Sequence, residues 1–101
     1  MSEQFNKRCK FTSFIPMLIE EMIFKGYQPC IGRDGLKHKK NSLHYEGLAA
    51  DIDLFKDGVY LADGKDHKQF GEFWESLDKD CAWGGRFADP NHYSIKYGGR
   101  K

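Results

Sequence analysis

Apolar residues recur along the chain in two rhythms, one typical of helices and one typical of strands. Near the N-terminus they recur at three- and four-residue spacing, which predicts a core-facing helix from about residue 12 to Gly26. Its apolar stripe consists of Ile15, Leu18, Ile19, Met22 and Ile23. Pro16 suits the first turn of such a helix. Residues 1–10 are mostly polar, and we expect them to form a loose lead-in.

Apolar and polar residues alternate strictly near the centre of the chain, which is typical of a strand. In residues 48–55 the apolar side chains of Leu48, Ala50, Ile52 and Leu54 would point to one face of a strand and Asp51 to the other. The following Asp-Gly pair, residues 57–58, is typical of a hairpin and predicts an antiparallel return over residues 59–61. Shorter strands are expected over residues 27–31, at an edge of the sheet because of its proline, and over residues 81–87 and 93–97.

A second helix is predicted from about Gly64 to Asp78. Asp63 would cap it, and its buried stripe would consist of Phe70, Phe73, Trp74 and Leu77. His67 lies at the edge of this stripe, as a packed or a capping histidine. The pattern predicts an α+β fold in which two main helices pack on a small antiparallel sheet. We expect a single domain over residues 1–101, with a frayed tail at residues 98–101.

The charge and the length of the chain limit the classes of partner that the protein can bind. The 16 basic and 15 acidic residues leave a net charge of +1, which gives no general attraction to nucleic acid. Basic residues cluster at residues 37–40 and 99–101, either as solvated segments or as contacts to an anionic polymer such as the cell envelope. A chain of 101 residues buries a modest core, so that a bound metal would add appreciably to its stability. We expect a monomer.

The cysteines and the apolar runs indicate where in the cell the protein is made and whether it enters a membrane. The three cysteines are odd in number and lack metal-type spacing, which favours synthesis in a reducing compartment. The longest apolar run, residues 14–19, is short and interrupted by Pro16, so we expect no membrane insertion. The N-terminus lacks the apolar region of a signal peptide.

Two stretches, residues 42–51 and 83–92, together contain the donors of a catalytic zinc site. His44, Asp51 and His92 would supply two imidazoles and one carboxylate and leave one coordination position for water. His44 lies seven residues before Asp51, an odd spacing that requires a turn or bulge between them, which Gly47 can provide.

Asp89 lies three residues before His92. The intervening Pro90 disfavours a helix, whereas Asp-Pro-Asn suits a type I turn whose ends lie within about 7 Å. Asp89 would then be close enough to act as a general base on water, or it could serve only as a turn-capping residue.

These stretches resemble a family of zinc peptidases that act on bacterial cell-wall peptides. The family includes D-alanyl-D-alanine carboxypeptidases and dipeptidases and phage L-alanyl-D-glutamate endopeptidases, and it shares its fold with the hedgehog signalling domain. The matching residues are Ser42, His44, Gly47, Ala49, Asp51, Trp83, Gly84, Gly85, Asp89 and His92. Similarity to the small phage members extends from about Gly26 to Tyr93, about two thirds of the chain.

The resemblance implies roles for individual residues. His44, Asp51 and His92 correspond to the zinc ligands, and Asp89 to the general base. Ser42 would orient the substrate or the ligand environment. The family also has an oxyanion-stabilising arginine before a helical excursion. Arg33 lies only eleven residues before His44, so the excursion is deleted here and Arg33 is the candidate for that arginine.

The chain also differs from the family pattern directly after His92. Relatives often continue with an aromatic residue and then Glu or Gln, whereas this chain has Tyr93 and Ser94. Ser94 therefore replaces the carboxylate or amide that contacts the metal environment in those relatives.

Three functions follow as hypotheses. The first is a zinc peptidase that cleaves peptidoglycan stem peptides, as a phage or prophage endolysin with L-alanyl-D-glutamate specificity. The second is a D-alanyl-D-alanine carboxypeptidase or dipeptidase. The third is a domain that keeps zinc for structure or binding, without catalysis. For an endolysin, we expect synthesis in the bacterial host cytoplasm without a signal peptide and action on the cell wall after release through holes in the inner membrane.

Overall fold

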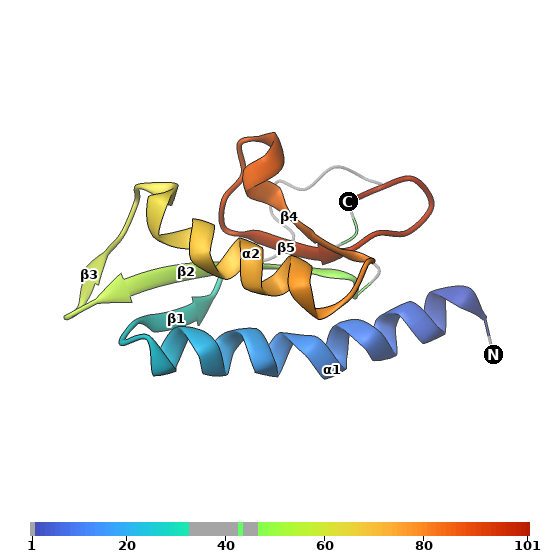
Figure 1. The fold of residues 1–101 in the computed structure, drawn as a ribbon, viewed down its shortest axis with the longest axis horizontal. Helices are drawn as coiled ribbons and strands as arrows, with labels where there is room; N and C mark the ends of the chain where they lie inside the picture. Colours follow the sequence, from blue (N-terminus) through green and yellow to red (C-terminus); the bar gives the residue numbers. More distant parts are fainter. Residues whose placement is uncertain (1, 33–42, 44–46) are drawn as a thin grey trace.

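The computed structural model describes residues 2–32, 43 and 47–101 (Figure 1). The described chain forms an α+β domain with two helices and a small antiparallel sheet. The elements in chain order are α1 (Glu3–Phe24), β1 (Gln28–Ile31), β2 (Ala49–Lys56), β3 (Val59–Tyr60), a 3₁₀ turn η2 (Gly64–Asp66), α2 (His67–Leu77), β4 (Cys81–Trp83), a second 3₁₀ turn η3 (Gly84–Phe87) and β5 (His92–Ile95). The predicted fold class is confirmed at this level.

The sheet has the strand order β1-β2-β5-β4, and β3 pairs with the C-terminal end of β2. All pairings are antiparallel, and β1 lies at an edge, as its proline predicted. Asp57 and Gly58 both have positive φ, as the two-residue turn of the predicted hairpin requires. Strand β2 pairs with β5 over the segment that contains Asp51, so it lies at the centre of the sheet.

Helix α1 differs from the prediction at its N-terminal end. It begins at Glu3, where the Ser2 side chain accepts a hydrogen bond from the backbone N–H of Phe5. The predicted loose lead-in over residues 1–10 is therefore wrong. Lys7 bonds to Asp80 at 2.7 Å, and Lys10 bonds to both Asp78 and Asp80 at 3.0 Å. These pairs tie the first turns of the helix to the approach to β4.

The core lies between the two helices and the sheet, and it contains much of what the apolar patterns predicted. The fully buried side chains include Leu18, Met22, Leu48, Ile52, Leu54, Phe70, Trp74, Tyr93 and Ile95. Ile23 is an exception, because it is 58% exposed on α1. Trp74 of α2 packs edge-on against Tyr93 of β5 and donates its indole N–H to the Ser94 carbonyl at 3.0 Å.

None of the helices in the described part of the chain is long and apolar enough to cross a membrane.

Candidate metal centre

Asp51 and His92 are directly opposite one another in the sheet. They are Cα partners in the antiparallel pairing of β2 with β5, and opposed residues of such a pair point to the same face. The backbone N–H of Ile52 donates to the Asn91 carbonyl at 2.8 Å, which fixes this register. The distance from Asp51 Oδ1 to His92 Nδ1 is 3.6 Å. His92 is buried and Asp51 is half-buried, so the pair is partly protected from water.

Asp89 reaches the same place through a tight turn. The backbone N–H of His92 donates to the Asp89 carbonyl at 3.1 Å, which closes the predicted four-residue turn. Asp89 in turn donates its N–H to the Gly84 carbonyl at 2.8 Å. The turn is fixed from outside by Trp83, whose indole N–H donates to the Pro90 carbonyl at 2.7 Å. The Asp89 side chain is exposed, on the open side of the pair.

Asp51, Asp89 and His92 form a cluster that could hold a metal ion. One possible ligand atom from each residue lies within 4.8 Å of the others. Two carboxylates and one imidazole are a donor set that zinc accepts, because it binds both oxygen and nitrogen ligands. The described residues therefore fit a divalent metal.

The Trp-Gly-Gly sequence has a steric role. A Cβ on Gly84 would collide with the Asp89 carbonyl oxygen and would lie 2.6 Å from the His92 Cβ. A Cβ on Gly85 would collide with the Trp83 ring. The two glycines thus allow the chain to turn closely around the indole and to bring Asp89 beside His92.

Glu75 supports this loop from α2. Its carboxylate accepts a 2.8 Å hydrogen bond from Arg86 and a 3.4 Å bond from the Trp83 backbone N–H. Burial opposes the charge of this carboxylate, but these hydrogen bonds lower the pKa of Glu75 overall. No local pattern in the sequence links Glu75 to residues 83 and 86, so this support was not predicted.

The structure brings together three of the predicted site residues. Asp51, Asp89 and His92 are adjacent, whereas His44, Ser42 and Arg33 lie outside the described residues. Gly47 has a φ of 71°, consistent with the turn that the spacing from His44 to Asp51 required.

Three contacts near the cluster were not apparent from the sequence. His92 Nε2 is 3.2 Å from the main-chain oxygen of Lys101, and the Phe87 ring packs edge-on against the imidazole at 5.6 Å between ring centroids. Asn91 donates its side-chain N–H to Asp53 at 3.1 Å. The two contacts of His92 act on the ring itself, whereas the Asn91 bond fixes the turn that precedes it.

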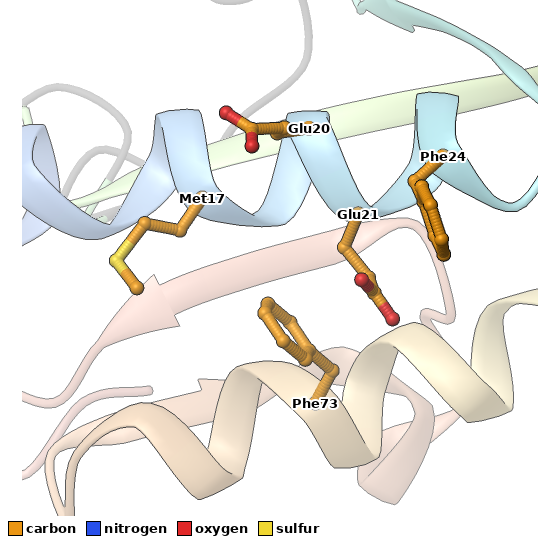
Figure 2. Close-up of a pocket in the computed structure, with 5 residues that line it drawn as sticks. All are labelled: Met17, Glu20, Glu21, Phe24 and Phe73. Atoms are coloured by element: carbon orange, nitrogen blue, oxygen red, sulfur yellow. The ribbon is translucent and has the colours of Figure 1, made fainter.

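A separate groove lies between the two helices (Figure 2). It has a volume of about 410 Å³ and is lined by Met17, Glu20, Glu21, Phe24 and Phe73. None of these residues belongs to the metal cluster, which is built from β2, β5 and the turn before β5. The groove is therefore a distinct surface feature.

Comparison of the chain with protein-family models, with curated proteins and with solved structures gave no match.

Proposed function

We propose that this protein is a zinc metallopeptidase that hydrolyses peptidoglycan stem peptides, as a phage or prophage endolysin with L-alanyl-D-glutamate endopeptidase specificity. The observation that carries the proposal is the cross-strand pair of Asp51 and His92, with Asp89 on its open side. The sequence resemblance assigned these three residues to one catalytic centre, and they are close together in the folded chain.

In this proposal Asp51 and His92 hold the metal together with His44. The cross-strand register orients the two described ligands without help from a flexible loop, because both lie on paired strands. When bound, zinc would polarise the scissile carbonyl and lower the pKa of a water molecule toward about 7.

Asp89 is the general base. Its position on an exposed turn gives it access to both water and substrate, whereas the buried His92 has no such access. It accepts the proton of the attacking water and then delivers it to the leaving amine. Arg33 would stabilise the oxyanion and Ser42 would orient the substrate, as the resemblance implies.

The proposed substrate, a peptidoglycan stem peptide, comes from the sequence resemblance to the cell-wall zinc peptidases. Peptidoglycan stem peptides contain the L-alanyl-D-glutamate bond and the D-alanyl-D-alanine bond, and related enzymes cleave one or the other. The endopeptidase is preferred because the similarity extends through the segments shared with the small phage members. Such an enzyme would be made in the host cytoplasm and would act on the wall after release.

Mass spectrometry of digested peptidoglycan tests the proposal. Purified protein should release new amino termini on D-glutamate, and a chelator should abolish the release until zinc is restored. Release of free D-alanine instead would identify the carboxypeptidase. Zinc binding without any new termini would support a non-catalytic zinc domain, and it would contradict the proposed peptidase.

A further inference from the structure

Residues 97–101 form a turn that we call the terminal hairpin. Tyr97 and Arg100 exchange two backbone hydrogen bonds of 3.0 Å, and the two residues between them, Gly98 and Gly99, have φ values of 59° and 76°. Positive φ at both central positions defines the tight turn that favours Gly-Gly. The expected frayed tail is thus a folded reversal. The Arg100 guanidinium also lies over the Tyr97 ring, 5.7 Å from its centroid.

The reversal returns the chain to the metal cluster. It places the main-chain oxygen of Lys101 3.2 Å from His92 Nε2. The other ring nitrogen, Nδ1, is the one that lies 3.6 Å from Asp51 Oδ1. The two nitrogens of one imidazole therefore have different partners, one on β2 and one in the terminal hairpin.

The two distances select a tautomer. Both partners offer acceptor oxygens, but the 3.6 Å between Nδ1 and Asp51 Oδ1 is too long for a hydrogen bond, whereas the 3.2 Å between Nε2 and the Lys101 oxygen is within range. A main-chain oxygen only accepts hydrogen bonds, so a bond at Nε2 requires the ring hydrogen on Nε2. A neutral imidazole with this hydrogen has its lone pair on Nδ1, directed toward Asp51 and the cluster. Metal-binding histidines commonly donate their second ring nitrogen to a carbonyl or a carboxylate, which fixes the orientation of the ring.

We propose that the terminal hairpin positions His92, with the Lys101 main-chain oxygen holding the imidazole in the Nε2–H tautomer so that Nδ1 faces the metal. This inference rests on the proposed metal centre and names an acceptor that the sequence did not identify. The Lys101 side chain has no part in it, because the contact is made by the backbone.

Nitrogen-15 NMR of the metal-free protein tests the tautomer directly. Long-range ¹H–¹⁵N correlations at alkaline pH should show the His92 ring with its hydrogen on Nε2. A ring with its hydrogen mainly on Nδ1 would overturn the proposal. Because this measurement needs neither zinc nor substrate, it decides the inference even if the chain has no peptidase activity.

Two variants test the consequence for metal binding. In Gly98→Val/Gly99→Val, β-branched residues cannot adopt positive φ without strain, so the turn should open and zinc affinity should fall by about 10- to 100-fold. Lys101→Ala is the matched control, because it keeps the main-chain oxygen; its zinc affinity should stay within about 2-fold of that of the original chain.

The double variant should remain folded, since the hairpin lies outside the buried core, and its melting temperature checks this. Unchanged zinc affinity in a folded double variant would contradict the proposal. If the variant unfolds, the tautomer of the original chain still gives the answer. Failure of the original chain to bind zinc would count against the proposed function and not against the tautomer.

Discussion

Gly84 has a strict steric requirement beside the cluster of Asp51, Asp89 and His92. One of its α-hydrogens faces the Asp89 carbonyl and the His92 Cβ, where a methyl group has no room. Four residues along the same loop, Ala88 has a φ of 64°, a left-handed conformation that costs an alanine about 1 kcal/mol. The loop thus contains a glycine at Gly84 that leaves no room for a side chain, and an alanine at Ala88 in a conformation suited to glycine.

We expect Gly84→Ala to destabilise the fold by about 1–3 kcal/mol, because the loop must move away from β5. The same movement should separate Asp89 from His92 and slow peptidoglycan hydrolysis, because the proposed base would no longer lie beside the metal. Urea unfolding and the rate of hydrolysis measure the two effects.

Ala88→Gly is the matched substitution in the same loop. Glycine adopts positive φ without steric cost, so stability should be unchanged or should rise by up to about 1 kcal/mol. A Gly84→Ala variant as stable as the original chain would show that the loop does not press against His92 as described.

At the scale of single residues, the sequence predicted the cluster but not the contacts around it. Asp51, Asp89 and His92 were predicted to lie together from their residue types, their spacing and the family resemblance, and the structure brings them together. The contacts of Lys101 and Glu75 were missed because they form only in the tertiary fold. A backbone oxygen carries no sequence signature, and Glu75 acts on Trp83 only after α2 and β4 have packed together.

The contact between α2 and β5 includes a buried polar pair. The first residue of α2, His67, places its Nδ1 2.7 Å from the hydroxyl of Tyr93, and both side chains are buried. Burial lowers the pKa of His67 to about 4, although the charges of Asp53 and Asp66 partly oppose this. Burial likewise raises the pKa of the Tyr93 hydroxyl. The pair is therefore neutral in the folded protein near neutral pH.

This pair should make stability depend on pH. The unfolded chain binds a proton at His67 near pH 6.5, whereas the folded chain resists it until about pH 4. The free energy of unfolding should therefore fall as the pH drops from 6.5 to 4, by up to about 3 kcal/mol. Chemical unfolding at a series of pH values measures this.

His67→Gln is the control, since glutamine can bond to Tyr93 and does not titrate in this range. Its free energy of unfolding should lose most of the dependence on pH between 6.5 and 4. An equal slope in both proteins would assign the effect to other groups.

The elements themselves were predictable where a local pattern decided them. The hairpin after β2 and the stripe of α2 were both correct, because each depends on residues close in sequence. The start of α1 was not, since its first turns are polar. They gain support from Asp78 and Asp80, some seventy residues away, and sequence reading does not detect that pairing.

At the scale of the whole molecule, the proposed metal would link strands that are distant in sequence. Asp51 belongs to the centre of the sheet and His92 to its neighbour, so an ion between them would add a constraint that the unfolded chain lacks. Metal binding and folding should therefore be coupled.

Zinc at 100 times its dissociation constant should add about 2.7 kcal/mol to the free energy of unfolding. For a domain of this size, that corresponds to a rise in melting temperature of about 10–20 °C. Asp51→Asn should abolish the rise, because the amide is a poor substitute for the carboxylate ligand. An equal shift in this variant would place the ion elsewhere in the molecule.

The most direct test of the central claim measures zinc content and peptidoglycan hydrolysis together in Asp89→Ala, with Glu72→Ala as a control that removes an exposed carboxylate from α2. The account predicts that Asp89→Ala keeps its zinc and loses hydrolysis by about 100-fold or more, because only the base is gone, while the control is unchanged. Near-normal hydrolysis by Asp89→Ala, or loss of its zinc, would contradict the account.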